Sequence, residues 1–502
     1  MSTWNETLTG KQAWLLCSAV LLLHVTPLLM ADMPVLDDQT RQYGASNDWL
    51  QVGRPLVVVL NAILGFGPAA VNIYPLPLLL AVLVTGHALA HLVQYWFQVP
   101  TFSAVLVVLP IWLQPFFLQN LSYQYDGAAM GLALACGAWA VTLGCDRLRH
   151  WLGGVVLLAA CAALYQPGLS VAAGLFGIDL MRRVMEGNSI GLATRFAALR
   201  LGQLLAGVSA FYVSCAWLVE GQQRARFLRF DDQWLGELYR RLAKTAGIVD
   251  LLATPWIYWL YLGLIILALI GLRCEMVMLW RRHAGYLQRL GLILVLVGVI
   301  PFVAASTAGV TLFLAGFSAD ARTLMGLGAV LVLLLYLVHG ALRAWPRVRL
   351  LVLCMALLPM LSLSFAYGRV LVAQKALHQS IATSLAYDLS SRPDLAAAEH
   401  YYISGFWQSR LWVPAAAGTL QHMPVVERFD PSWYVLLPEM LPQVGVDYFG
   451  VFFKAPPLSN KQVREQSPVP RVTHRLYDIH MVGDDAYVLI KLPPGTGDEK
   501  EH

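Results

Sequence analysis

Two adjacent carboxylates, Asp37 and Asp38, follow the first long apolar segment of the chain. Neighbouring side chains in a helix or a strand point in different directions, so we expect the two acids to have different roles. One can act as a general base on an incoming hydroxyl, and the other can hold an arginine or a backbone amide. The structural alternative is that Asp37 caps a helix over 38–50, because Asp is a favoured N-cap residue.

Four arginines are candidates for binding a lipid phosphate. Arg41 and Arg54 come soon after the two acids, and Arg322 and Arg369 come much later. A guanidinium group binds a phosphate through two parallel hydrogen bonds, which fixes its orientation as well as its charge. The alternative for Arg54, Arg322 and Arg369 is that they are anchors at the membrane interface.

Two further turns carry side chains suited to a sugar. Tyr125 and Asp126 form one turn, in which the carboxylate can bind a sugar hydroxyl and the tyrosine can stack on a sugar face. Tyr165 and Gln166 form the other, and Gln166 offers both a donor and an acceptor. The alternatives are that Asp126 caps a helix over 128–145 and that the second turn is only a connection.

The sequence does not favour metal or nucleotide chemistry. His87 and His91 are four residues apart and can share one helical face, but no acidic partner stands near them, which favours interior packing. The seven cysteines have no metal-knuckle or disulfide spacing. No phosphate-binding loop, dinucleotide fingerprint or nucleophile elbow stands out, so a nucleotide-hydrolysing pump is not expected.

Composition indicates which elements must position these residues. The chain has 502 residues, of which 58% are hydrophobic and 13% charged, whereas a soluble domain carries about 25% charged residues. The apolar residues also come in blocks. These features exclude a soluble enzyme, a disordered chain and a collagen-like fibre. The net charge of +5 is too modest to predict nucleic-acid binding.

The apolar blocks predict an α-helical polytopic membrane protein with about eleven spanning segments of about 20 residues each. An uncleaved anchor is favoured over a signal peptide for the first, because no small-residue cleavage site follows it. Residues 55–73 are interrupted by Asn, Gly and Pro and predict an interfacial helix. The predicted spans are 13–30, 75–95, 102–119, 128–145, 151–166, 168–182, 201–220, 254–272, 290–308, 324–342 and 349–368.

The positive-inside rule predicts the orientation. Arginines concentrate in alternate connections within 147–149, 182–200, 273–289 and 343–349, which we assign to the cytoplasm together with the N-terminus. The acids of 31–54 then lie outside. The basic loop 221–252 also falls on the outer side, where its arginines and Lys244 can meet phosphates or form a solvated amphipathic helix.

Residues 371–502 differ from the rest. They are more polar, contain paired prolines, and include short alternating runs such as 485–490. We predict a mixed α/β domain on the outer side, the periplasm of a Gram-negative host. Residues 1–370 form the predicted transmembrane domain, with 31–54 as its catalytic first outer loop.

The order of these motifs resembles a known family. Asp37-Asp38, Arg41, Gly44, Trp49 and the run Gly53-Arg54-Pro55-Leu56 look like the first outer loop of bacterial Gtr-type glucosyltransferases, which glucosylate O-antigen and change serotype. The turns at 125–127 and 165–166 are similar too. The resemblance covers the membrane part, and residues 371–502 have no match.

The resemblance implies a glycosyltransferase of the GT-C class in the bacterial inner membrane. It implies a polyprenyl-phosphate sugar, typically undecaprenyl-phosphate glucose, as donor and lipopolysaccharide O-antigen or a similar glycan as acceptor. The base is then Asp37 or Asp38, and Trp49 joins the sugar- or acceptor-binding candidates. Arginines alone can hold a monophosphate carrier, so neither a metal nor a cofactor is expected.

Three other functions compete. A transporter or lipid flippase would need ionisable residues or broken helices near the midplane, but the acids cluster at one face. An O-antigen polymerase or ligase would concentrate Arg and His in one outer loop, which 221–252 partly does. A scaffold needs no outer carboxylate. The first loop therefore favours transfer.

Overall fold

The computed structural model describes residues 6–35, 37–215, 228, 233–404, 411–429, 440–446 and 457–491. Within these ranges the chain divides into two units, one made of 1–29 and 45–365 and the other of 30–44 and 366–502. The predicted boundary at 370 differs from this division, which groups 30–44 with the C-terminal part. Arg224, Arg226 and Arg229 of the basic loop lie outside the described residues.

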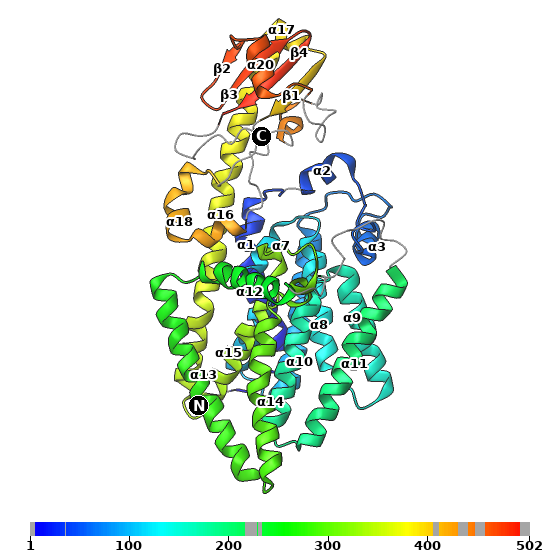
Figure 1. The fold of residues 1–502 in the computed structure, drawn as a ribbon, viewed down its shortest axis with the longest axis vertical. Coiled ribbons are helices and arrows are strands. Elements are labelled where there is room, and N and C mark those ends of the chain that lie inside the picture. The colour runs from blue at the N-terminus through cyan, green and yellow to red at the C-terminus, as the bar shows by residue number, and fades with distance from the viewer. Residues whose placement is uncertain are drawn as a thin grey trace. The chain divides into compact units, whose positions relative to one another are not determined.

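The first unit is built of helices (Figure 1). Among the described residues, six helices are long and apolar enough to cross a membrane, namely α1, α4, α11, α13, α14 and α16. The total of eleven spans stays a prediction. The bounds are α1 Gly10–Ala31, α3 Pro55–Leu64, α4 Leu76–Trp96, α5 Phe102–Val108, α6 Pro110–Leu113, α7 Phe117–Ser122, α8 Gly127–Thr142, α9 Leu148–Leu164, α10 Gly168–Met185, α11 Ile190–Cys215, α12 Trp234–Asp250, α13 Pro255–Arg282, α14 Tyr286–Ala305, η4 Gly309–Phe313, η5 Ala321–Thr323, α15 Leu327–Ala341 and α16 Pro346–Ser391.

The single helix predicted over 102–119 is wrong. This stretch is divided among α5, α6 and α7, and almost every residue in it is buried. Pro110 and Pro115 cause the breaks, because proline removes a backbone donor and clashes with the preceding turn. At the second break the Gln114 side chain accepts a hydrogen bond from the Phe116 amide at 3.0 Å.

Small residues let the long helices pack closely. A Cβ atom at Gly271 of α13 would lie 2.7 Å from the carbonyl oxygen of Leu337 in α15. A Cβ atom at Gly174 of α10 would lie 2.5 Å from the Cβ of Ala329, also in α15. Close backbone approach of this kind is a typical basis of helix association in membranes.

A buried ionic network joins four of these helices. Asp179 of α10 is fully buried and accepts hydrogen bonds from Arg182 at 2.9 Å and from the Tyr95 hydroxyl of α4 at 3.1 Å. Arg200 of α11 lies 3.9 Å from the same carboxylate and donates to two carbonyls near the end of α8, at 3.0 and 2.7 Å. Arg183 is a fourth neighbour, 3.5 Å from Asp179. One carboxylate therefore holds three guanidinium groups inside the unit.

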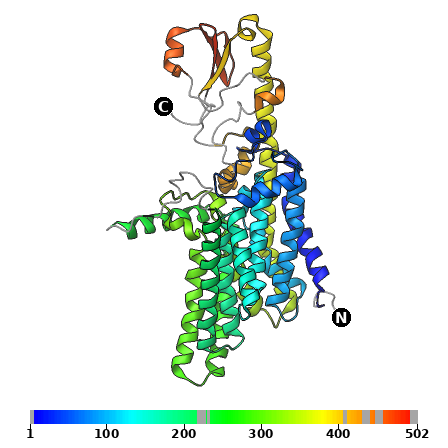
Figure 2. The same ribbon diagram turned by 90° about the vertical axis from the view of Figure 1, so that its right-hand side faces the viewer.

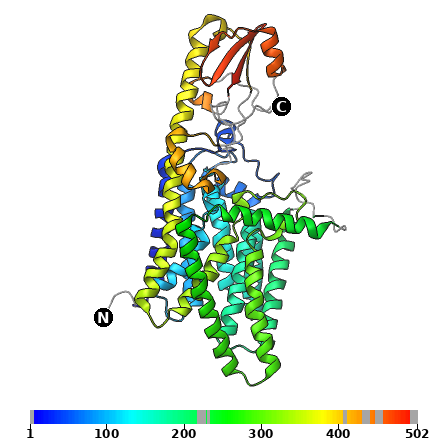
Figure 3. The same cartoon turned by 60° about the vertical axis from the view of Figure 1, so that its left-hand side comes forward.

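Helix α12 differs from its neighbours in direction. Figure 1 and Figure 3 show it lying across the ends of the long helices α13 and α14 rather than along them. It occupies the described part of the basic loop, so the prediction of an amphipathic helix there agrees with the structure.

The second unit contains a four-stranded sheet in the order β1-β4-β3-β2, in which β1 and β4 are parallel and the other pairs antiparallel. Gly483, with φ of 62°, makes the tight turn between β3 and β4. The strand predicted at 485–490 is confirmed as β4. The bounds are α2 Asp37–Gly44, α17 Pro393–Ala396, β1 His400–Ser404, η6 Pro414–Ala416, α18 Ala417–His422, η7 Pro424–Arg428, η8 Leu441–Val444, α20 Asn460–Gln466, β2 Val472–Thr473, β3 Tyr477–Val482 and β4 Asp485–Ile490.

Helices cover both faces of this sheet, as Figure 2 shows. Val488 and Ile479 face the end of α16, where Leu385 is fully buried against the sheet. Tyr487 and Leu489 alternate to the other face and pack against α20. The alternation follows from the two-residue period of a strand. Helix α16 thus continues far beyond the predicted end of its span at 368.

Candidate functional site

Asp126, at the start of α8, joins two side chains from the segment before α3. Its Oδ1 atom accepts a hydrogen bond from the Trp49 indole at 2.8 Å and another from Arg54 at 2.6 Å. Asp126 makes no side-chain hydrogen bond that caps α8, so its alternative role as a cap does not occur. Trp49 is fully buried and Asp126 nearly so, which makes this a shielded ion pair.

The turn between α9 and α10 contacts the same segment. The Arg54 guanidinium lies over the Tyr165 ring, 4.8 Å from its centroid, where a cation is attracted to the ring face. The Gln166 side-chain amide donates to the Gly53 carbonyl at 3.0 Å. Both residues of this turn therefore position Arg54 and its neighbours rather than serving only as a connection.

Arg322, in η5, approaches Tyr165 from another part of the chain. Its backbone carbonyl accepts hydrogen bonds from the Tyr165 hydroxyl and the Asn120 side chain, each at 3.1 Å, and its backbone amide donates to Gln119 at 2.6 Å. Its guanidinium donates to the Tyr123 hydroxyl at 3.1 Å. The main chain at Arg322 is thus held by three side chains.

Tyr165 lies within the influence of both arginines. Its ring lies beneath the Arg54 guanidinium, and its hydroxyl donates to the Arg322 carbonyl. The Tyr125 ring lies 6.4 Å from the Trp49 ring, which adds a second aromatic side chain. We call this set the arginine–aromatic cluster; it consists of Trp49, Arg54, Tyr125, Asp126, Tyr165, Gln166 and Arg322.

The cluster has the chemistry of an anion site. Side chains of Arg54 and Arg322 are 20% and 34% exposed, so both guanidinium groups keep access to a ligand. Asp126 neutralises part of the charge of Arg54, whereas the Asp320 carboxylate lies 3.9 Å from Arg322 and is half-exposed. Two oriented guanidinium groups beside aromatic rings suit a phosphate attached to a sugar.

The two adjacent acids begin α2, in the second unit. Asp37 is exposed, whereas Asp38 is fully buried. The Asp38 amide donates to the Val35 carbonyl at 3.1 Å, and the Val35 amide donates to the Asp38 carboxylate at 3.1 Å. This reciprocal pair fixes the start of α2. Asp37 is therefore the acid of the two that faces outward.

The remaining arginine candidates also belong to the second unit. Arg41 is half-buried on α2, and Arg369 is exposed on α16. Of the four arginines predicted to bind phosphate, Arg54 and Arg322 are in the first unit and belong to the arginine–aromatic cluster.

His87 and His91 pack among aromatic side chains. Their rings lie 4.9 Å apart, and His87 makes edge contacts with Trp14 and Trp139. Within the described part of the chain, no three His, Cys, Asp or Glu residues group in a way that could hold a metal ion.

Three residues of the site were not predicted as site residues. Gln119 and Asn120 hold the backbone of Arg322, and Tyr123 holds its side chain. Gln119 is the last residue of the predicted span 102–119. It was assigned to that span because the residues before it are mostly apolar. The signal was the adjacent Gln-Asn pair at the end of an otherwise apolar run.

We expect Asp126→Asn to lower the free energy of unfolding by about 2 kcal/mol, because it leaves the Arg54 guanidinium without its charged partner in a shielded site. Thermal melting of the purified protein in detergent measures the change. Asp320→Asn is the matched control, since its exposed carboxylate is 3.9 Å from Arg322 and should contribute less than about 1 kcal/mol. Equal melting of Asp126→Asn and wild type would show that the pair does not stabilise the unit.

Comparison with known proteins identifies one family whose model matches this chain. A family model described as glucosyl transferase GtrII matches residues 26–333. The chain is also 28% identical over 202 residues to an uncharacterized 55.3 kDa protein in the gtrB 5' region of Salmonella phage P22. That alignment covers 40% of this chain and 42% of the phage protein, so it spans less than half of either. No solved structure matches the chain.

Proposed function

Because the chain belongs to the glucosyl transferase GtrII family, we propose that it is an inverting membrane glycosyltransferase that uses a polyprenyl-phosphate sugar. The sugar is glucose, and the carrier is undecaprenyl phosphate. The acceptor is a cell-surface polysaccharide such as O-antigen, and the reaction takes place at the periplasmic face of the inner membrane. The proposal rests on the family match together with the arginine–aromatic cluster, which places two guanidinium groups among aromatic rings.

A lipid-linked donor is consistent with the location. Outside the cytoplasm a transferase has no nucleotide sugar at hand, so the leaving phosphate must arrive already attached to a membrane lipid. Arg54 and Arg322 are suited to hold that phosphate, and Tyr125 and Trp49 to contact the sugar. A phosphate held by arginines leaves without needing a metal ion to balance its charge.

The proposed reaction is a single displacement. Asp37 takes the proton from the acceptor hydroxyl, and the hydroxyl oxygen forms a bond to the anomeric carbon. The bond from that carbon to the phosphate oxygen breaks, and its electron pair leaves with polyprenyl phosphate. The products are the glycoside and polyprenyl phosphate, and the anomeric configuration is inverted. Exposure of Asp37 supports this role, because a base must reach its substrate.

Asp38 has a different proposed role. Its carboxylate is buried and binds the Val35 amide, so it positions the start of α2 and thereby Asp37. The two acids lie within the same stretch 31–54 as Arg54, which the sequence resemblance implies is the catalytic first outer loop.

The test is transfer by the purified full-length chain. Radiolabelled undecaprenyl-phosphate glucose and UDP-glucose are supplied in parallel with lipopolysaccharide carrying O-antigen. We expect label to enter the polysaccharide only from the lipid-linked donor. The new glycosidic bond should have the anomeric configuration opposite to that of the donor. Equal transfer from UDP-glucose would contradict the donor, and retention of configuration would contradict the mechanism.

If the protein were a lipid transporter, reconstituted vesicles would give a different result. Labelled lipid would then cross the bilayer without forming a glycoside. Movement of label between leaflets with no product, under conditions in which the reconstituted chain is folded, would replace the proposed transferase with a flippase.

A further inference from the structure

Helix α12 presents three distinct faces. Arg241, Thr245 and Ile248 are buried against the rest of the first unit. Leu235, Tyr239 and Leu242 form an exposed apolar face, with 61%, 76% and 43% of their surface accessible. The third face carries charged residues, among them Glu237, Arg240 and Lys244. A helix with separate apolar and cationic faces is typical of a segment that lies in the plane of a membrane surface.

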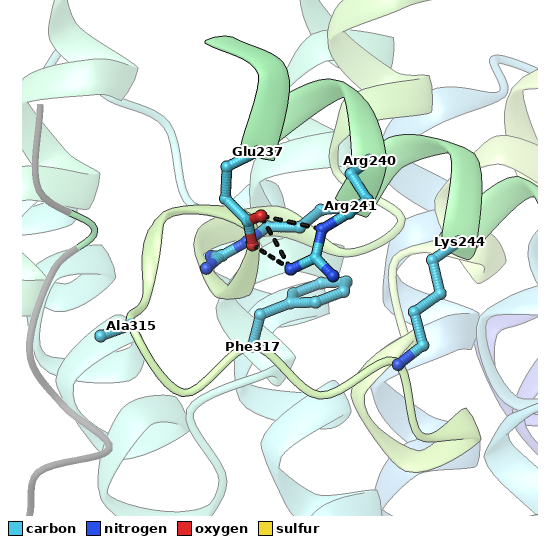
Figure 4. A pocket seen from close by; sticks show the side chains of 6 residues that line it. All are labelled: Glu237, Arg240, Arg241, Lys244, Ala315 and Phe317. Atoms are coloured by element: carbon cyan, nitrogen blue, oxygen red, sulfur yellow. Dashed lines mark hydrogen bonds and ion pairs between the residues drawn. The ribbon is translucent and has the colours of Figure 1, made fainter. Parts of the chain in front are cut away.

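The charged face borders a pocket. Its volume is about 140 Å³, several times the volume of one water molecule. Figure 4 shows α12 on one side of the pocket and the chain around Phe317 on the other. The pocket is lined by Glu237, Arg240, Arg241, Lys244, Ala315 and Phe317.

Arg241 forms the rigid part of this pocket. Its side chain donates to the carbonyls of Leu312 and Leu314 at 2.8 and 2.5 Å, and its guanidinium lies over the Phe317 ring at 5.1 Å. It also donates to Glu237 at 2.7 Å. These contacts fasten α12 to η4 and to the segment that follows it, so the pocket is part of the fold.

The pocket carries an excess of positive charge. Three cations line it against one carboxylate, Glu237. Hydrogen bonds from Arg241 and Arg240 lower the pKa of Glu237, which keeps it ionised at neutral pH. Arg240 is 78% exposed on its side chain despite that pairing, and Lys244 makes no ion pair with any described residue. Arg240 and Lys244 are therefore the cations available to an anionic ligand.

The neighbouring helix indicates where the pocket lies relative to a bilayer. Helix α13 is one of the apolar helices long enough to span, and it begins only a few residues after α12 ends. Trp256, Tyr258 and Trp259 at its start are exposed, at 87%, 54% and 66%. Trp and Tyr concentrate at the level of lipid headgroups. The pocket next to this aromatic belt is thus at headgroup depth.

We propose that the α12 pocket binds the phosphate of an anionic membrane-lipid headgroup. Arg240 and Lys244 contact the phosphate, Arg241 holds the pocket wall, and the apolar face of α12 contacts the acyl region. Glu237 limits the positive charge and so weakens the site. This inference does not depend on the proposed sugar transfer.

Native mass spectrometry of the full-length protein in a neutral detergent tests the site, with phosphatidylglycerol and phosphatidylcholine as the probes. We expect phosphatidylglycerol to bind more tightly than phosphatidylcholine to wild type. The double variant Arg240→Gln/Lys244→Gln should bind phosphatidylglycerol roughly tenfold more weakly, because it loses two charge-assisted contacts in a partly solvated pocket. Glu237→Gln should bind it more tightly.

Matched variants and ligands make the result decisive. Arg464→Gln removes a charge from the exposed surface of α20 in the second unit and should leave lipid binding unchanged. Arg241 is left intact, and size-exclusion behaviour confirms that each variant is folded. The proposed site would be overturned if the double variant bound phosphatidylglycerol with wild-type affinity. It would also be overturned if Arg464→Gln lost as much affinity as the double variant. Competition by inorganic phosphate at the same concentration as the lipid would assign it to free phosphate instead.

Discussion

Asp37→Asn is expected to reduce sugar transfer roughly a thousandfold while leaving the protein folded. The substitution keeps the size of the side chain but removes its ability to take a proton, and general-base catalysis typically contributes 10²–10⁴-fold. Asp37 is exposed on α2, so its loss removes no described hydrogen bond from the core of the second unit. The measurement is the rate of label transfer from undecaprenyl-phosphate glucose at saturating donor and acceptor.

Asp38→Asn is the comparison that separates a base from a positioning residue. Because Asp38 is buried and accepts from the Val35 amide, its substitution should lower the melting temperature as well as the rate. Asp37→Asn should change the rate without changing the melting temperature. Full activity of Asp37→Asn, together with an inactive and normally melting Asp38→Asn, would move the role of base to Asp38.

The second large effect concerns stability. Asp179→Asn should lower the free energy of unfolding by about 3–5 kcal/mol, the usual cost of removing one partner from a buried ionic group. The loss is large because Arg182, Arg183 and Arg200 would remain close together without their shared carboxylate. Thermal melting in detergent and the fraction of monodisperse protein after purification are the measurements.

Glu186→Gln is the matched control for Asp179→Asn. Glu186 also accepts a hydrogen bond from Arg182, at 2.5 Å, but its side chain is 43% exposed. A solvated pair of this kind contributes less than about 1 kcal/mol. If the two variants melted alike, burial of the network would not be what stabilises it.

Helix positions were the most predictable part of the fold. Long apolar runs such as those of α4 and α14 have few other options in a membrane, because every backbone polar group must be paired within the segment. Hydropathy located the start of α16 but placed its end near 368. The helix continues to Ser391 because backbone hydrogen bonds persist in water, and Leu385 packs on the sheet. A hydropathy pattern measures lipid preference and does not detect that packing.

The residue types of the site were predictable, but their pairings were not. Asp126 and Tyr165 were singled out as sugar ligands, and in the fold one holds Trp49 and Arg54 while the other lies beneath Arg54. These contacts join residues 72 or more positions apart. Spacing along one helix or strand carries no information about such pairs, which depend on how the helices pack.

Asp37 and Asp38 are a second case in which the residue types were predictable but their surroundings were not. Their types and their opposed directions follow from local geometry. Which of the two is buried depends on the turn before α2, where the Val35 amide binds Asp38. The sequence alone therefore left the choice open, and the exposure of Asp37 now gives a physical reason to prefer it as the base.

The way in which Arg322 is held has a consequence for how this site can change. Its backbone is fixed by the side chains of Gln119, Asn120 and Tyr165, whereas its guanidinium donates to the Tyr123 hydroxyl. A new side chain at this position would project from the same main-chain geometry, and the cost would be the hydrogen bond to the Tyr123 hydroxyl. If Arg322 binds the donor phosphate as proposed, a small designed library at this one codon should alter ligand binding with little effect on folding, which makes position 322 a practical starting point for retargeting the protein.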